Sequence, residues 1–391
     1  MTKVVVAGVG MIPFTKPGKS EPYDVMGATA IRLALADAGL SYDQVQQAFA
    51  GYIYGESTSG QTALYRVGMS GIPVFNVNNN CATGSSALFL ARQMIEAGVI
   101  DCALAFGFEQ MMPGALPTTW ADRPNPLTAW ADQSQKLQPA EAYPAPHLFG
   151  GAGVEYMKLH GTKPETFARI SVKARQHAKH NERAIFRDLV TVEEVMASTP
   201  IYGPLTKLQC CPPTCGAAAA VLVSEAFAKR HGIDTSVRIL GQAMTTDFDN
   251  TFKSDSMIKA VGYDMSKAAA DSVYAQAGIG PMDLDVVELH DCFTANELVT
   301  YEALGLTPEG TAEKFICDGD NTYGGRVVTN PSGGLLSKGH PLGATGLAQC
   351  FELTEQLRGR LGPRQVEGAR LALQHNIGIG GACVVTLYGK Q

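Results

Sequence analysis

Two short segments place a cysteine and a histidine where they could act together as nucleophile and base. Cys81 follows three asparagines and precedes the small residues Ala82-Thr83-Gly84, which lead into an apolar helical stretch. At a helix N-terminus the unpaired N–H groups and the dipole stabilise an anion, so the thiol pKa is expected to fall. His340 lies between Gly339 and Pro341, in a turn that enters another helix. Because imidazole titrates near neutrality, His340 is a candidate base.

Two further segments carry polar or glycine residues directly after apolar strands. His290-Asp291-Cys292-Phe293 follows such a strand, at the edge of a sheet where ligands usually bind. Gly378-Ile379-Gly380 forms a glycine-rich turn that could bring backbone N–H groups to a developing oxyanion. Two of these patterns also have plain structural explanations. Glycine-rich turns are mostly tight turns, and a lone cysteine before a helix, such as Cys81, is commonly an inert buried residue.

A sequence repeat predicts how these segments meet. Ala36-Asp37-Ala38-Gly39-Leu40 resembles Ala275-Gln276-Ala277-Gly278-Ile279, and Ala82-Thr83-Gly84 resembles Ala344-Thr345-Gly346 in the same order. Apolar strands alternate with helical segments throughout, which is typical of a sheet covered on both faces. Duplication with a small insertion explains the repeat, although chance coincidence in Ala- and Gly-rich segments is the alternative. If two such halves pack about a pseudo-twofold axis, Cys81 and His340 meet as a dyad.

The segment from about 113 to 205 has no counterpart in the second half. It begins rich in proline and becomes polar and basic near its end. A long insertion between strands commonly forms a lid or a binding lobe, because binding and catalytic residues are frequent in long surface segments. A spacer or a dimer-stabilising excursion fits the pattern equally well.

Composition excludes several classes of protein. The chain has 391 residues, 45% hydrophobic and 17% charged, with 42 glycines, so it can bury a sizeable core and is not a charge-dominated disordered chain. The net charge of -6 argues against nucleic acid or an anionic membrane as partner. No apolar run approaches the ~18 residues of a membrane span.

Cysteine usage and the two ends of the chain predict a cytoplasmic location. Nine cysteines, an odd number, occur without a visible secretory signal, so free thiols are expected. No signal or transit peptide precedes the first strand, and the final Gly389-Lys390-Gln391 is not a peroxisomal tripeptide.

Taken together, Asn78 to Leu88, His290 to Phe293 and Asn330 to Gly346 resemble the thiolase superfamily, most closely its sterol-carrier-protein-2-type thiolases. The resemblance runs over essentially the whole chain. It implies an α/β thiolase fold, with two βαβαβαββ halves in a five-layer α-β-α-β-α sandwich and an inserted loop domain. The implied N-terminal half comprises residues 1–114 and 206–232, the loop domain 115–205, and the C-terminal half 233–391.

The resemblance also implies a role for each candidate residue. Cys81 takes the acyl group as a thioester, and His340 activates Cys81 and helps to form an oxyanion hole. His290 holds a water or donor in that hole. Most thiolases carry an acid/base cysteine in a Cys-x-Gly motif, which reads Gly378-Ile379-Gly380 here, so the acid/base role passes to Cys292. Gly380 then supplies a backbone donor beside the Cys81 N–H, and Cys383 is not the missing cysteine.

Further implied contacts concern the substrate. His147 is expected to border the pantetheine and acyl pocket. The 3′-phosphate of coenzyme A could be reached by a basic run, for which a solvated helix face is the alternative: Lys173, Arg175, Lys179 and Arg183. Coenzyme A and acyl-CoA are substrates, and no cofactor is implied. A metal site is rejected, because the spacings of the nearby histidines and cysteines fit no strong ligand pattern: His177, His180, Cys210, Cys211 and Cys215.

The predicted function is thiolytic cleavage of 3-ketoacyl-CoA, or the reverse Claisen condensation, by a homodimer or a dimer of dimers. Three alternatives remain at this stage. They are a 3-ketoacyl synthase, a thiolase-like aldolase that works with a partner subunit, and a non-catalytic lipid-transfer protein.

Overall fold

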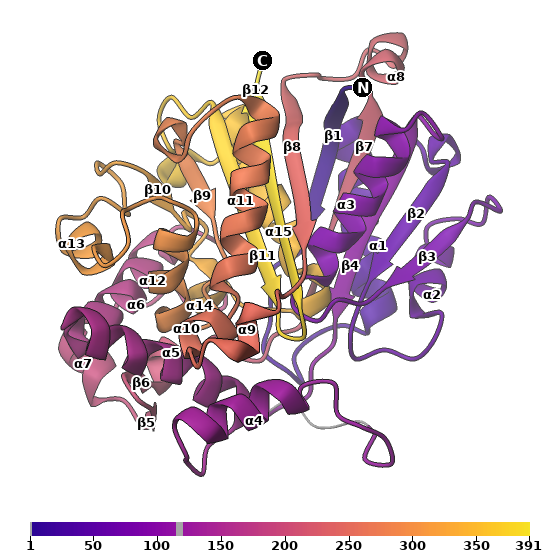
Figure 1. Cartoon of the computed structure of the whole chain (residues 1–391). Coiled ribbons are helices and arrows are strands. Elements are labelled where there is room, and N and C mark those ends of the chain that lie inside the picture. Colours follow the sequence, from indigo (N-terminus) through magenta and orange to yellow (C-terminus); the bar gives the residue numbers. More distant parts are fainter. Residues whose placement is uncertain (1, 115–119) are drawn as a thin grey trace.

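A ten-stranded mixed sheet forms the centre of the protein (Figure 1). The structure is a computed structural model that describes residues 2–114 and 120–391. Five strands come from each half of the chain. The N-terminal strands are β1 (Val4–Met11), β2 (Gln47–Gly51), β3 (Val74–Val77), β4 (Cys102–Glu109) and β7 (Gly216–Ser224). The C-terminal strands are β8 (Val237–Thr245), β9 (Val286–Glu288), β10 (Val328–Thr329), β11 (Leu371–Gly378) and β12 (Ala382–Lys390).

The two halves of the sheet repeat one strand order. From the outer edge inward it is β3-β2-β4-β7-β1 in the first half and β10-β9-β11-β12-β8 in the second. In each half the outer three strands run parallel to one another. The next strand inward, β7 in the first half and β12 in the second, runs antiparallel to both of its neighbours. The first strands, β1 and β8, pair antiparallel and join the halves, with Val4 opposite Ile239. This confirms the duplicated βαβαβαββ plan.

Both halves of the chain also contain helices. In the first half they are α1 (Tyr23–Ala38), α2 (Ser59–Tyr65), α3 (Thr83–Glu96) and α8 (Glu225–His231). In the second they are α9 (Asn250–Lys253), α10 (Met257–Ala260), α11 (Tyr263–Ala277), α12 (Thr294–Ala303), α13 (Ala312–Cys317), α14 (Gly334–Ser337) and α15 (Leu342–Arg358). The described residues also contain four single turns of 3₁₀ helix: Tyr42–Gln44, Lys207–Gln209, Pro281–Asp283 and Gly362–Arg364.

Helices α3 and α15 form the middle of five layers. They pack on each other, and α15 contacts β4 and β7 of the first half as well as β9, β11 and β12 of the second. Helix α1 covers the outer face of β1 and β7, and α11 covers the outer face of β8 and β12. Every residue of β1, β4 and β7 is buried, as expected for strands covered on both faces.

The repeated segments lie at equivalent places of the two halves. Helices α1 and α11 end at Gly39 and Gly278, whose φ values of 65° and 69° are left-handed. The second pair of segments spans the starts of α3 and α15. The helix starts pack closely, because a Cβ on Gly84 would lie 2.8 Å from the Gly343 carbonyl oxygen. The sequence therefore brings the two helix N-termini together, as the duplication predicted.

The chain between β4 and β7 forms a separate group of elements at the lower left of Figure 1. They are α4 (Thr128–Leu137), α5 (Pro144–His160), α6 (Pro164–Ala178), α7 (Val192–Ala197), β5 (Pro200–Tyr202) and β6 (Leu205–Thr206). Helices α5 and α6 pack on α10, α12, α13 and α14 of the second half. The inserted chain therefore lies against the loops that carry His290 and His340. The predicted domain limits stay a prediction.

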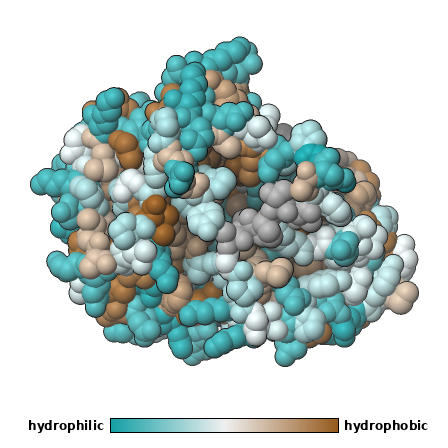
Figure 2. All heavy atoms as spheres, turned by 90° about the horizontal axis from the view of Figure 1, so that it is seen from below, coloured by the Kyte–Doolittle hydropathy of each residue, from teal (hydrophilic) through white to brown (hydrophobic). Residues whose placement is uncertain are grey.

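The face seen from below in Figure 2 is mostly polar, with apolar atoms in small separate groups. Among the described residues no helix is both long and apolar enough to cross a membrane.

Candidate active site

Three of the predicted residues meet at one point. Cys81 precedes α3, His290 follows β9, and His340 precedes α15. The Cys81 sulfur and one ring nitrogen of each histidine all lie within 4.8 Å of one another. The two imidazole rings are 5.0 Å apart between centroids and nearly perpendicular. A thiol and two imidazoles are thus within reach of a single reacting group.

The asparagine run before Cys81 shapes the turn that presents the thiol. Asn80 adopts a left-handed φ of 50°, which asparagine tolerates better than most residues. Its side-chain N–H donates to the Ile379 carbonyl at 3.0 Å, and the Asn79 side chain donates to Ser86 at 3.0 Å. These bonds hold the turn against the β11–β12 hairpin and against α3, so Asn79 and Asn80 fix the position of the turn that carries Cys81.

Burial raises the pKa of Cys81 to about 12, and the nearby Glu109 carboxylate adds to the shift. This contradicts the fall in pKa expected from the helix N-terminus. The start of α3 does lie beside the thiol, but removing a thiolate from water costs more free energy than the helix end returns. The resting nucleophile is a neutral thiol, which needs a base when it attacks.

His340 is held so that one ring nitrogen stays available. Its backbone N–H donates to the Thr214 hydroxyl at 2.9 Å, and its Nδ1 lies 2.7 Å from the Thr345 hydroxyl. Thr345 donates its only hydroxyl proton to the Pro341 carbonyl at 3.0 Å, so it accepts from Nδ1–H. The other nitrogen, Nε2, is buried without a partner. It is therefore a free acceptor beside the Cys81 thiol.

The charge state of both histidines suits these positions. Burial and the Lys338 ammonium lower the pKa of His340 to about 3. Burial also lowers the pKa of His290 well below its usual range, with His340 and His375 contributing. Both imidazoles are neutral at pH 7, so His340 can accept a proton from Cys81.

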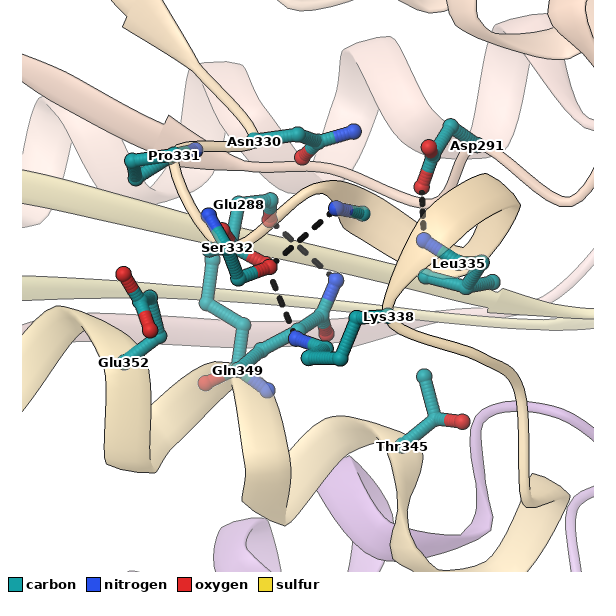
Figure 3. Close-up of polar contacts among 12 residues, drawn as sticks. Glu288, Asp291, Asn330, Pro331, Ser332, Leu335, Lys338, Thr345, Gln349 and Glu352 are labelled. Atoms are coloured by element: carbon teal, nitrogen blue, oxygen red, sulfur yellow. Dashed lines mark hydrogen bonds and ion pairs between the residues drawn. The ribbon is translucent and has the colours of Figure 1, made fainter. Parts of the chain in front are cut away.

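Buried ion pairs and caps fix the loop that carries His340 (Figure 3). The Glu288 carboxylate accepts from the Lys338 ammonium at 3.3 Å and from the Ser332 hydroxyl at 2.8 Å. The Asp291 carboxylate accepts from the Leu335 N–H at 2.7 Å, at the start of α14. The loops that follow β9 and β10 are thereby locked together, and Asp291 of the His-Asp-Cys-Phe segment has an anchoring role.

Cys292 lies next to Cys211, a second cysteine that the sequence analysis considered only as a metal ligand and rejected. The Cys211 N–H donates to the Cys292 carbonyl at 2.9 Å, and the flanking residues Cys210 and Phe293 form an antiparallel bridge. Burial raises the pKa of Cys292 well above its usual range, with further contributions from Cys211 and Cys81. Cys292 is therefore a neutral thiol close to the nucleophile, as a proton donor must be. All nine cysteines are free.

The role of Gly380 as a backbone donor beside Cys81 stays a prediction. Gly380 is exposed in the hairpin turn, and a Cβ there would approach only Leu127, at 3.5 Å. Gly378 is buried against the nucleophile turn, because a Cβ there would lie 2.2 Å from the Asn79 oxygen and 3.1 Å from the Ala82 nitrogen. Gly378 therefore packs closely on the turn that carries Cys81.

The basic residues expected at the coenzyme A phosphate do not form one surface. Lys173 is buried and pairs with Glu297, and it also donates to Thr329 at 2.6 Å. The guanidinium carbon of Arg175 lies 4.4 Å from the centre of the Phe186 ring, and that of Arg183 lies 4.7 Å from the centre of the Phe351 ring. Only Lys179, at the end of α6, is exposed. The assignment of Lys173 to the phosphate is wrong, because its ammonium is used inside the protein.

His147 lies inside the inserted chain. It is buried in α5, its Nε2 lies 2.7 Å from the Gln138 carbonyl, and its ring packs on Tyr202. Its predicted contact with substrate stays a prediction.

Glu109 is a buried acid that sequence reasoning missed. Its carboxylate accepts from the N–H groups of Ile53, Tyr54 and Gly343, at 3.2, 2.9 and 3.0 Å. Burial raises its pKa to about 7 despite these bonds. Glu109 ends the apolar strand β4, so the signal that singled out His290 after β9 could have found it too. It fixes the start of α15, and with it the His340 turn.

We expect Glu109→Gln to remove part of the pH dependence of stability. The pKa in the folded protein, about 7, lies above the ordinary 4.5. The contribution of this group is therefore fully present below the ordinary pKa and is lost as pH rises through about 7. Between about pH 5 and 8 the urea midpoint of the wild type should fall more than that of the variant. A parallel fall in both would contradict the assignment. Near pH 5 the variant should be less stable than the wild type by roughly 1–3 kcal/mol, because its amide cannot accept at both positions, and this difference should shrink as the pH rises.

Family models match almost the whole chain. The thiolase N-terminal domain matches residues 4–226, and the thiolase C-terminal domain-like family matches residues 250–388. The chain belongs to the thiolase family, whose members are generally acyltransferases.

Three relatives show which proteins of the family this chain is similar to. The chain is 54% identical to sterol carrier protein 2 of Rattus norvegicus, over 99% of this chain and 72% of the relative. It is 46% identical to non-specific lipid-transfer protein-like 2 of Caenorhabditis elegans, over 99% and 96%. An acetyl-CoA acetyltransferase of Methanothermobacter thermautotrophicus is 34% identical over the full length of both chains.

Solved structures share the fold at low identity. The Ltp2-ChsH2(DUF35) aldolase superposes with a TM-score of 0.81 at 23% identity, over 99% of this chain and 98% of that chain. Human mitochondrial 3-ketoacyl-CoA thiolase superposes with a TM-score of 0.75 at 18% identity, over 100% and 99%. The predicted thiolase fold is confirmed.

Proposed function

We propose that the protein is a thiolase that cleaves 3-ketoacyl-CoA with coenzyme A, or runs the reverse condensation. The observation that carries the proposal is the convergence of the Cys81 sulfur with His290 and His340. A neutral thiol beside an unpartnered Nε2 of a neutral imidazole is arranged for nucleophilic attack with proton transfer. Coenzyme A and acyl-CoA are the substrates, and the proposed chemistry needs no resident cofactor or metal.

In the proposed cleavage, the Cys81 sulfur attacks the 3-keto carbon and its proton passes to His340 Nε2. The bond between C2 and C3 breaks, the acyl group stays on Cys81, and the departing acetyl-CoA carbanion takes a proton from the Cys292 thiol. Coenzyme A then gives its thiol proton to the Cys292 thiolate and attacks the Cys81 thioester. The shortened acyl-CoA leaves, and the Cys81 sulfur takes back the proton held on His340 Nε2. Backbone and histidine donors stabilise the oxygen that becomes negative in each step.

Lipid transfer is the second candidate, because two relatives are named for sterol or lipid carriage. Against it, a carrier has no use for a buried thiol beside a free imidazole nitrogen. A panel of 3-ketoacyl-CoA thioesters of different chain length and branching, each assayed for cleavage that depends on coenzyme A, separates the candidates. We expect turnover of at least one thioester. Transfer of labelled lipid between vesicles without any cleavage would replace the proposal with the second candidate.

A further inference from the structure

A line of buried side chains runs from the middle of β11 to His290. Gln374 and Asn376 lie on the same side of β11, two residues apart, and Ser85 lies on α3. Hydrogen bonds join Gln374 Nε2 to Ser85 Oγ at 2.7 Å, Ser85 Oγ to Asn376 Oδ1 at 2.8 Å, and Asn376 Nδ2 to His290 Nδ1 at 2.8 Å. Each of these side chains is at most 1% exposed. We call Gln374, Ser85 and Asn376 the amide array.

The direction of every bond in the amide array follows from one backbone carbonyl. Gln374 Nε2 lies 2.7 Å from the Gly346 oxygen, which can only accept, so this atom must be the amide nitrogen. Tyr388 donates to the other end of the same amide. Gln374 therefore donates its second proton to Ser85. The Ser85 hydroxyl accepts this bond and is left to donate its own proton to Asn376 Oδ1.

The nitrogen of Asn376 then faces His290. An amide nitrogen donates and does not accept, so His290 Nδ1 must be the bare nitrogen of the ring. Because a neutral imidazole carries one proton, that proton lies on Nε2. With Nδ1 engaged by Asn376, Nε2 is the nitrogen that the ring can present to Cys81 and His340.

His340 has the opposite tautomer. Its Nδ1–H donates to Thr345 and its Nε2 is bare, as shown above. The two imidazoles are adjacent, buried and neutral, yet one presents an N–H and the other a lone pair to the same space. A lone pair can take the Cys81 proton, whereas an N–H can stabilise a carbonyl oxygen that becomes negative.

We propose that Asn376, held by Ser85 and Gln374, is a positioning residue that fixes His290 as the Nε2–H tautomer and so divides the donor and base roles between two neighbouring histidines. The catalytic part of this inference rests on the proposed thiolase function. The tautomer itself does not, because it is a property of the free protein.

The tautomer also governs metal binding at this point. A cysteine and two histidines within 4.8 Å form three ligands of a tetrahedral zinc site, provided that both imidazoles offer a bare nitrogen. In the wild type the proton on His290 Nε2 opposes this. Asn376→Asp places a carboxylate against His290 Nδ1. That carboxylate favours a proton on Nδ1, which is the arrangement common for metal-bound histidine.

The first experiment measures the tautomer directly. Protein labelled with ¹⁵N-histidine is studied by long-range ¹H–¹⁵N NMR near pH 7, and the His290 signals are assigned by their loss in His290→Asn. We expect a bare Nδ1 and a protonated Nε2 for His290, and the reverse for His340. A protonated Nδ1 and bare Nε2 on His290 would overturn the proposal, even if every variant below failed to fold.

The second experiment compares Asn376→Asp with a matched control. Asn321→Asp makes the same buried amide-to-acid change at a residue that bonds Tyr301, outside the amide array. Zinc affinity, measured by competition with a chromogenic chelator, should rise about 10–100-fold in Asn376→Asp and stay unchanged in Asn321→Asp. Equal zinc affinity of the wild type and Asn376→Asp would contradict the inference.

Turnover gives a separate readout. Asn376→Asp, assayed with chelator present, should lower kcat about 10²–10³-fold with a smaller change in KM, because the loss falls on a transition-state donor. Unchanged kcat with the tautomer reversed would remove the catalytic role of the donor. If the wild type shows the expected tautomer but cleaves no thioester, the proposed function fails and the assignment of Asn376 to the tautomer stands.

Discussion

Cys81→Ala should abolish acyl transfer while the protein stays folded. The substitution removes the sulfur that lies beside His290 and His340, and loss of a nucleophile commonly costs on the order of 10⁴–10⁶-fold in kcat. The fold should survive, because the turn that carries Cys81 is held by bonds from Asn79 and Asn80, which the substitution leaves in place. The measurement is mass spectrometry after incubation with acetyl-CoA, with peptide mapping of the adduct.

The control for this prediction is Cys317→Ala, which removes an exposed cysteine far along the chain. The wild type and Cys317→Ala should both carry one acetyl group on Cys81, and Cys81→Ala should carry none. An acetyl group found on another cysteine in the wild type would show that the nucleophile is misassigned.

Cys292→Ala should block carbon–carbon cleavage yet spare formation of the Cys81 acyl-enzyme. Acylation from acetyl-CoA needs the Cys81 thiol and the free His340 nitrogen, whereas cleavage of a 3-ketoacyl-CoA also needs a proton for the departing carbanion. A raised thiol pKa suits a donor that must hold its proton until the carbanion forms. The variant should still exchange labelled coenzyme A with acetyl-CoA but lose cleavage by about 10²–10⁴-fold.

Two matched cysteine variants sharpen this test. Cys383→Ala should leave both reactions nearly unchanged, because the Cys383 thiol faces Ser266 at 3.8 Å, in the outer core of the second half. Cys211→Ala removes the thiol beside Cys292 and so tests whether Cys292 or Cys211 donates the proton to the carbanion. Cleavage lost in Cys211→Ala and kept in Cys292→Ala would transfer the acid role to Cys211.

Much of this architecture is predictable from local patterns. Apolar strands, glycine helix ends such as Gly39 and Gly278, and the repeated helix starts each depend on a few neighbouring residues. The repeat then supplies the one long-range relation needed, since equivalent helix starts in two packed halves must converge. For that reason the meeting of Cys81 with His340 follows from the sequence once duplication is assumed.

The tertiary structure decided the properties that depend on burial and on distant partners. The pKa of Cys81 rises because many parts of the chain exclude water from it, which outweighs the helix end visible in the sequence. The Lys173 ammonium is buried because it forms an ion pair with Glu297, and the residues next to either one in the sequence do not indicate this pairing. The close packing of Gly378 on the turn before Cys81 depends on how the β11–β12 hairpin lies against that turn. The tautomer of His290 depends on hydrogen bonds from α3 and β11. The sequence thus determines which residue types lie at the ends of each helix and strand. The charge state of these residues, the position of their protons and their hydrogen-bond partners depend on the packing of segments that are far apart along the chain.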